Sequence, residues 1–235
     1  MSRIYGTVPY LRDINIWLDI NSAMAKLTAE QSYQIILFLL GTIRSSQTEI
    51  SRFTGASKSQ VNRLVTTLID TGVMKYVEGR LLEVNDPIRL LDKIAFERPL
   101  SKLVKKEIQL EYSEVSKVED AIRNACKRSE IQYALTCFSA LNKYHQYHIT
   151  YPTVHVYTNE QSKLESKLPL GKGAVLVQLL VPDHEIIMQT ARMKDGFNLV
   201  DPVQVIIDLF CLGSIGRDGA IKLWEVVKSN VISSH

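Results

Sequence analysis

The sequence predicts an α+β protein of two domains, a winged helix-turn-helix followed by a small α/β domain. Two observations lead to this prediction. Three helix starts and a hairpin follow one another in the first third of the chain, and strands alternate with helices in the second half. The length of 235 residues suits two modest domains, and a hydrophobic content of 46% is enough to give each domain a core.

Three tetrapeptides in the first third have the pattern of a capping box, at residues 28–31, 46–49 and 57–60. In such a box the hydroxyl of the first residue accepts a free backbone N–H, and the Glu or Gln three positions later bonds back to the cap. Apolar residues at helical spacing follow each box. We expect the first helix to bury Ile36, Leu39, Leu40 and Ile43, the second Ile50 and Phe53, and the third Val61, Leu64, Val65 and Leu68.

The connections within this unit are short. Gly55, which favours a helix end, and Ala56 alone separate the second helix from the third, as in a helix-turn-helix. After Gly72, the β-prone runs 73–77 and 80–84 flank Glu78 and Gly79, which is typical of a hairpin. A hairpin in this place is the wing of a winged helix. An additional helix, with apolar residues from Leu11 to Leu18, is expected ahead of the unit.

The outward face of the third helix carries short polar side chains, cations and no acid before Asp70. A helix that enters the major groove needs such a face, because amides bond adenine and arginine bonds guanine or phosphate. Cations near the helix start and on the hairpin would contact the DNA backbone. The residues expected to bind DNA are Arg44, Ser57, Lys58, Ser59, Gln60, Asn62, Arg63, Thr66, Lys75 and Arg80.

Domain boundaries follow from proline positions and charge. Residues 1–95 form the predicted winged helix-turn-helix domain with its extra helix, and residues 96–129 a charged helical connector of mixed sign. Residues 130–235 form the second domain. In it we expect a helix over 131–144, strands over 153–157 and 174–181, a helix from Asp201 to Leu212 and a last helix that ends near Lys228.

Three stretches of the second domain, residues 133–141, 154–157 and 200–209, followed by Gly216 and Arg217, resemble the type IV abortive-infection (AbiEi-type) antitoxin family. The resemblance implies a winged helix joined to a nucleotidyltransferase-like fold, and an autorepressor of a toxin–antitoxin operon. It also implies that Lys58, Gln60, Asn62 and Arg63 contact DNA, that no residue is catalytic, and that a toxin is a possible partner of the second domain.

An active nucleotidyltransferase needs a Gly-Ser turn and two alternating carboxylates that hold metal ions. The corresponding helix start here reads Thr136-Cys-Phe-Ser139, and the corresponding strand has His155 and Tyr157 in place of the acids. We therefore expect no catalysis, no metal and no cofactor. Two alternatives stay open: a nucleotide-handling enzyme that uses the second domain, and a winged helix that binds protein instead of DNA.

The partners expected from this reading are double-stranded DNA and a second copy of the chain, because a palindromic site needs two copies. The three cysteines contain no CxxC pair, so neither a disulfide framework nor a zinc module is expected. Without a signal peptide or a long apolar run, the expected location is the cytoplasm, away from membranes.

Overall fold

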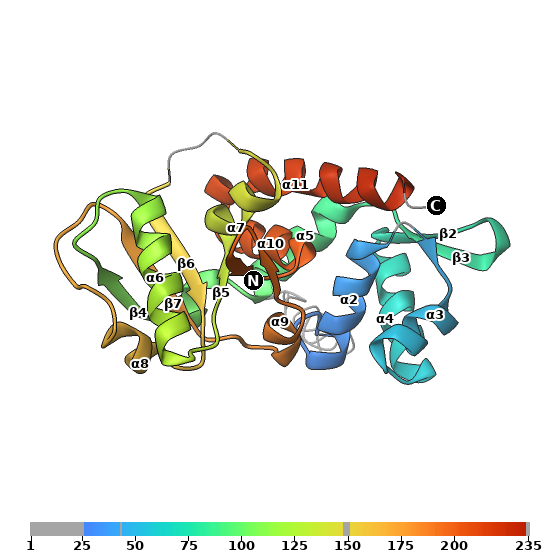
Figure 1. Ribbon diagram of the computed structural model, residues 1–235. Coiled ribbons are helices and arrows are strands. Elements are labelled where there is room, and N and C mark those ends of the chain that lie inside the picture. Colours follow the sequence, from blue (N-terminus) through green and yellow to red (C-terminus); the bar gives the residue numbers. More distant parts are fainter. Residues whose placement is uncertain (1–25, 43, 148–150, 234–235) are drawn as a thin grey trace, which may run out of the picture.

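The computed structural model describes residues 26–42, 44–147 and 151–233, and it is an α+β structure with two separate sheets. The helix expected around residues 11–20 lies outside the described residues, as does Ile43. A bundle of helices with a short hairpin forms one end of the molecule, and a six-stranded sheet forms the other (Figure 1). In the described part of the chain, no helix is both long and apolar enough to cross a membrane.

Of the described residues, those from 30 to 97 form four α-helices, a short 3₁₀ helix and a three-stranded antiparallel sheet of order β1-β3-β2. These elements are α2 (Glu30–Gly41), β1 (Arg44–Ser45), α3 (Gln47–Thr54), α4 (Lys58–Asp70), β2 (Met74–Val77), the 3₁₀ helix η1 (Glu78–Arg80), β3 (Leu81–Val84) and α5 (Pro87–Glu97). The order of helices and hairpin agrees with the order expected from the sequence. The β2–β3 hairpin projects from the end of the molecule opposite the large sheet (Figure 1).

Two of the three expected capping boxes are present. Ser46 caps α3 and Ser57 caps α4, and in each the third residue of the helix bonds back to the cap. The first expected box is wrong, because α2 begins after Ala29 without a side-chain cap. Thr28 instead donates its hydroxyl to Glu97 at the end of α5, 3.1 Å away, so a tertiary contact replaces the local one.

The apolar faces of α2 and α4 are buried as expected. In α2 the buried residues include Ile36, Leu39 and Leu40, and in α4 they are Val61, Leu64, Val65 and Leu68. The expectation for Phe53 is wrong: its side chain is 63% exposed, and only Ile50 of α3 is buried. The helix has eight residues, and Phe53 stacks on Phe38 of α2 at 5.4 Å on the outside of the bundle.

The segment 96–129 is helical only in part: the helix expected from its apolar spacing is present from Val115, but a strand precedes it. After the 3₁₀ helix η2 (Leu100–Leu103), strand β4 (Val104–Gln109) pairs antiparallel with β7 and forms one edge of the large sheet. Burial alternates along this strand, with Val104, Lys106 and Ile108 on the more buried face, although only Ile108 is fully buried. Helix α6 (Val115–Ser129) follows, with Val118, Ile122 and Cys126 buried.

The large sheet has the order β4-β7-β6-β5-β9-β8 and mixed strand directions. Strands β6 and β7 are parallel, as are β5 and β9, and the other neighbours are antiparallel. The bounds are β5 (Ala134–Thr136), β6 (Thr153–Tyr157), β7 (Leu176–Leu180), β8 (Arg192–Lys194) and β9 (Phe197–Leu199). The helix expected over 131–144 is partly wrong, because β5 precedes the short helix α7 (Cys137–Tyr144).

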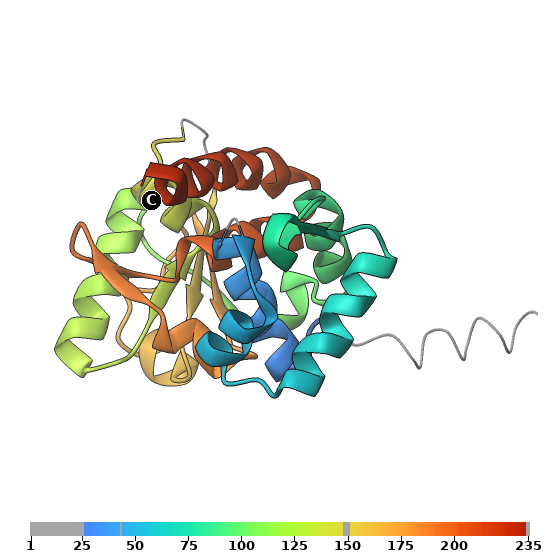
Figure 2. The same cartoon turned by 90° about the vertical axis from the view of Figure 1, so that its right-hand side faces the viewer.

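Helix α10 (Pro202–Cys211) lies at the centre of the molecule. The carboxylate of Asp201 accepts the Val203 N–H, and every residue from Val203 to Cys211 is buried. The remaining helices are α8 (Gln161–Glu165), α9 (Glu185–Gln189) and α11 (Ser214–Ser233). Helix α11 runs along the top of the molecule, packed on α10 (Figure 2). Because α10 also packs against α2 and α5, the buried apolar residues form one cluster from Leu27 to Leu223.

Candidate nucleic-acid interface

The turn between α3 and α4 is tight because of its local sequence. Gly55 adopts a left-handed conformation with φ of +69°, and its N–H bonds to the Ser51 carbonyl at 3.0 Å. Ala56 is buried against the core, and Ser57 caps the next helix. The connection therefore leaves little freedom in the angle between α3 and α4.

The outer face of α4 carries five exposed side chains that the sequence placed there. They share short polar or cationic groups, and none is an acid: Lys58, Ser59, Asn62, Arg63 and Thr66. The opposite face of α4 is fully buried, so the helix presents this surface from a rigid base. A surface of this composition can donate and accept hydrogen bonds and can bind an anionic backbone.

Gln60 does not belong to this outward face. Its Oε1 accepts the backbone N–H of Ser57 at 2.9 Å and the Ser57 hydroxyl at 2.8 Å. A bidentate contact with adenine needs both the oxygen and the nitrogen of an amide. The sequence suggested both a capping role and a base-reading role for Gln60, and the structure shows the capping role. The Ser57 hydroxyl is likewise engaged at the cap.

Two of the cations expected to contact a DNA backbone share an acid of the hairpin. Glu83 of β3 lies 2.9 Å from Nε of Arg44 and 3.5 Å from Nζ of Lys75. The hydrogen bond from Arg44 is the main reason that the pKa of Glu83 is lowered. The hairpin edge therefore has a net charge of +1 from these three groups, and the free cation of the hairpin is Arg80 at its tip. Arg80 is exposed and has no ion-pair partner among the residues that the structure describes.

The structure adds two side chains that the sequence analysis missed. Gln47, at the start of α3, donates its amide to the Tyr76 hydroxyl at 3.2 Å and to Oδ1 of Asn62 at 3.5 Å. Tyr76 on β2 is 54% exposed and lies beside the outer face of α4. Strand alternation would place Tyr76 on the same side as the buried Met74. It is exposed even though Leu82, its cross-strand partner on β3, is buried.

A buried ionic cluster joins the helical end to the sheet end. Arg98, the residue after α5, lies 2.8 Å from Asp208 of α10 and 2.7 Å from Asp183 of the loop before α9. It also donates to the Tyr157 hydroxyl of β6 at 2.8 Å. Asp208 further accepts the Thr136 hydroxyl at 2.6 Å, so elements far apart in sequence meet at one guanidinium–carboxylate pair.

Burial governs the acid–base properties of this cluster. Complete burial raises the pKa of Asp208, and the Arg98 charge and the hydrogen bond from Thr136 act in the opposite direction. Burial opposes the charge of Arg98, but Tyr157 and the nearby carboxylates outweigh it and raise its pKa well above the usual value. The geometry of the two side chains is that of a buried structural ion pair.

A second set of polar contacts links α2 to the same region. The Tyr33 hydroxyl donates to Oε1 of Gln204 on α10 at 3.0 Å, and its ring stacks on His184 with centroids 4.0 Å apart. Nδ1 of His184 lies 2.7 Å from a carboxylate oxygen of Glu30. Helix α2, which supports α4, is thus attached to α10 by directional bonds as well as by apolar packing.

The strand end where a nucleotidyltransferase would carry its chemistry has a different composition. Cys137 has φ of +52°, a left-handed conformation that is strained for any residue with a side chain. Thr136 pairs with His155 across β5 and β6, and His155 and Tyr157 are both buried. The Arg98–Asp208 pair fills the space next to Tyr157. Within the described residues, no group of three or more His, Cys, Asp or Glu side chains could hold a metal ion.

Comparison of the chain with protein-family models, with curated proteins and with solved structures finds no match. The resemblance to the antitoxin family therefore remains a prediction from the sequence. The geometry of α4 and of the hairpin is the basis for a functional proposal.

Proposed function

We propose that this protein is a DNA-binding transcriptional regulator with a winged helix-turn-helix, in which α4 enters the major groove and the β2–β3 hairpin is the wing. The observation that carries the proposal is the outer face of α4, defined above. It combines five exposed polar or cationic side chains, no acid before Asp70, and a fully buried opposite face.

The roles of the side chains follow from their chemistry and position. Asn62 and Arg63, in the middle of α4, are suited to base edges, because an amide can bond adenine and a guanidinium can bond guanine. Lys58 in the first turn is suited to a phosphate, since unpaired backbone N–H groups and the helix dipole also attract an anion there. Arg80 at the hairpin tip is suited to the flanking backbone.

Support for this orientation comes from the contacts of Asn62. The Gln47 amide lies 3.5 Å from Oδ1 of Asn62, which is the outer limit of a hydrogen bond, so the exposed Asn62 amide can exchange this contact for a base edge; Gln47 also bonds Tyr76 of the hairpin. Helix α4 and the wing therefore share a side-chain contact on the outer surface, as they would if both faced one ligand. The sheet end of the molecule serves, in this proposal, as a non-catalytic domain that contacts a protein partner such as a toxin, and the regulator acts as an autorepressor.

The proposal also includes a homodimer, because one α4 covers only a half-site and a palindromic operator places two half-sites about one helical turn apart. Light scattering after size-exclusion chromatography, with and without the operator duplex, measures this state. A single copy on a saturated operator would contradict the dimer and leave the DNA-binding proposal in place.

The primary experiment is a fluorescence-anisotropy titration of a duplex from the protein's own promoter against a scrambled duplex, repeated at several salt concentrations. Tighter binding to the promoter, with affinity that falls steeply as salt rises, is the expected result. Equal and weak binding of both duplexes would refute the proposal.

Variants separate base contacts from phosphate contacts. Arg63→Ala should cost about 1–3 kcal/mol on the promoter and reduce the preference over the scrambled duplex. Lys58→Ala should weaken both duplexes alike and lower the salt slope by about 1. The matched control is Lys127→Ala, an exposed lysine on α6 at the far end of the molecule, which should leave both affinities unchanged.

A further inference from the structure

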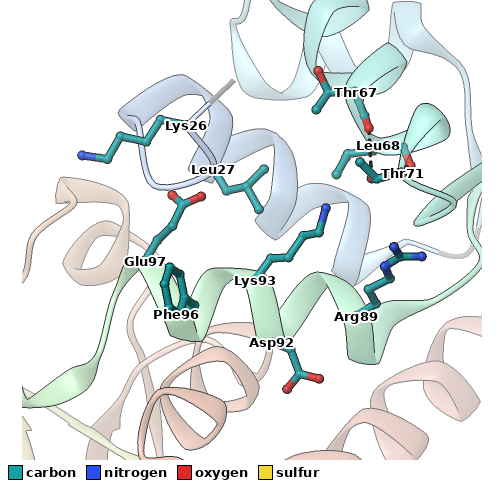
Figure 3. Close-up of a pocket in the computed structure, with 10 residues that line it drawn as sticks. All are labelled: Lys26, Leu27, Thr67, Leu68, Thr71, Arg89, Asp92, Lys93, Phe96 and Glu97. Atoms are coloured by element: carbon teal, nitrogen blue, oxygen red, sulfur yellow. Dashed lines mark hydrogen bonds between the residues drawn. The ribbon is translucent and has the colours of Figure 1, made fainter. Parts of the chain in front are cut away.

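A cavity of about 590 Å³ lies behind α4, between its last turn, helix α5 and the segment that precedes α2 (Figure 3). Its size is in the usual range of small-molecule sites. The floor is apolar, with Leu27 and Leu68 both buried, and Phe96 stands at the rim. Thr67 of α4, and Thr71 directly after this helix, line the side opposite α5.

Among the charged side chains that line this cavity, both acids are bonded to other residues, whereas two cations of α5 have no partner in the described part of the chain. Arg89 and Lys93 lie one helical turn apart on α5 and extend towards α4 (Figure 3). Neither side chain has a hydrogen-bond or ion-pair partner within residues 26–42, 44–147 and 151–233. Asp92 points away from the cavity and accepts from Arg217 on α11 at 3.0 Å.

Glu97, the other acid of the lining, is bonded to Thr28. Its carboxylate accepts the Thr28 N–H at 3.2 Å and the Thr28 hydroxyl at 3.1 Å. Burial and the neighbouring Arg89 lower the pKa of Lys93, and the charge of Glu97 opposes this effect only in part. An anion between Arg89 and Lys93 would oppose this effect further.

The aromatic ring at the rim narrows the class of ligand. Phe96 is 89% exposed, although it lies next to Lys93 along α5 and close to the buried Leu27. A flat apolar group placed against this ring would remove its surface from water, and its anionic end would reach the two cations. We propose that this cavity is an effector site for a small aromatic carboxylate, with Arg89 and Lys93 binding the carboxylate and Phe96 contacting the ring.

The regulatory part of this proposal rests on the proposed function. Thr67 lies in the last turn of α4 and Thr71 is the residue that follows this helix, whose outer face carries the side chains proposed to bind DNA. A ligand that binds between α4 and α5 in one arrangement of these helices and not in another would change the affinity for DNA. Binding of the ligand can be measured without DNA. The ligand site and its effect on DNA binding can therefore be refuted independently of each other.

The first test is a titration of benzoate into the full chain, followed by calorimetry or by chemical-shift changes, with benzamide as the neutral analogue. Benzoate should bind about tenfold more tightly than benzamide, as expected for charge-assisted hydrogen bonds at a partly exposed site. Arg89→Met and Lys93→Met should each remove most of this difference. Lys102→Met, an exposed lysine outside the cavity, is the control and should change nothing.

Phe96→Ala provides an independent variant, because so exposed a side chain contributes little to folding. It should weaken benzoate and benzamide by the same factor and leave their ratio unchanged. Equal affinity of the two compounds for the original protein, or benzoate binding that the Arg89 and Lys93 variants leave intact, would overturn the assignment.

The second test repeats the promoter titration with saturating benzoate. A change in the affinity for the promoter duplex that disappears in Lys93→Met supports an effector site. Unchanged affinity, in a protein that binds both benzoate and DNA, would overturn the regulatory role and leave a ligand site without it. If the protein binds benzoate but no DNA, the proposed function fails and the ligand site stands.

Discussion

Replacement of Arg98 by methionine tests the buried cluster that joins the two ends of the molecule. Methionine keeps much of the length of the side chain and removes its charge. The side chain of Arg98 is 3% exposed and that of Asp208 is fully buried, so the variant leaves a carboxylate in the interior without its cation. Removal of one partner of a buried ion pair costs about 3–5 kcal/mol.

This loss is large compared with the whole stability of the fold. Single domains unfold with about 5–15 kcal/mol, and for a chain of this size each kcal/mol corresponds to about 2–4 °C in Tm. Arg98→Met should therefore lower Tm by about 6–20 °C. Urea denaturation followed by circular dichroism at pH 7 measures the free energy directly, and a thermal scan checks it.

A double-mutant cycle separates the pair from its individual members. Asp208→Leu alone removes the acceptor of Arg98, Thr136 and Tyr157, so it should also destabilise the protein. The combined variant should cost less than the sum of the two single changes, because neither buried charge then remains unpaired. The surface pair Arg217–Asp92 is the control, and Arg217→Met should cost less than about 1 kcal/mol. A cost below about 1 kcal/mol for Arg98→Met would refute the reasoning.

Two further predictions concern packing and pH. Gly216→Ala should destabilise the protein by about 2–3 kcal/mol in urea denaturation, because a Cβ at this position would lie 2.0 Å from the Leu209 carbonyl oxygen. Gly213→Asn is its control, because φ is +81° there and an added Cβ would have no heavy atom of a non-neighbouring residue within 4 Å. A cost as large as that of Gly216→Ala would contradict the packing argument. Burial lowers the pKa of His155 to about 4 from 6.5. As pH falls, His155 therefore takes up a proton in the unfolded chain before it does so in the folded protein. The free energy of unfolding should decrease by about 3 kcal/mol between pH 6.5 and pH 4. His155→Gln should show a shallower decrease between pH 7 and pH 4, and an identical pH profile would disprove the assignment.

Local sequence was sufficient to predict much of the helical end. The boxes at Ser46 and Ser57, the left-handed Gly55 and the buried face of α4 all depend on residues within one or two turns of each other. The Asp201–Pro202 start of α10 belongs to the same kind of signal. These features depend on hydrogen bonds and periodicity that the chain carries in any context.

The errors occurred where a distant segment competes with a local signal. Thr28 has the pattern of a cap, but Glu97 of α5 takes its hydroxyl. Residues 104–109 carry mixed charge like a connector, yet β7 provides the hydrogen-bonding edge that makes them a strand. Phe53 has helical spacing, but α3 is too short and too peripheral for a second buried turn.

The candidate nucleic-acid interface could likewise be predicted from the sequence only in part. The composition of the outer face of α4 could be read from the sequence, including its lack of acids before Asp70. The pairing of Glu83 with Arg44 and Lys75, and the contact of Gln47 with Tyr76, arise only when strand and helix are brought together. The cations could therefore be identified from the sequence, but which of them pair with Glu83 depends on the tertiary structure.

By itself, the sequence determined an α+β chain with the local order of helices and hairpin, because short-range capping, turns and periodicity need no partner segment. Only the tertiary structure decided that Arg98 and Asp208 meet in the interior and that Arg89 and Lys93 lie beside an open cavity. The reason is that desolvation and charge pairing depend on which atoms surround a group in space, and residues 110 positions apart carry no local signal that they will meet.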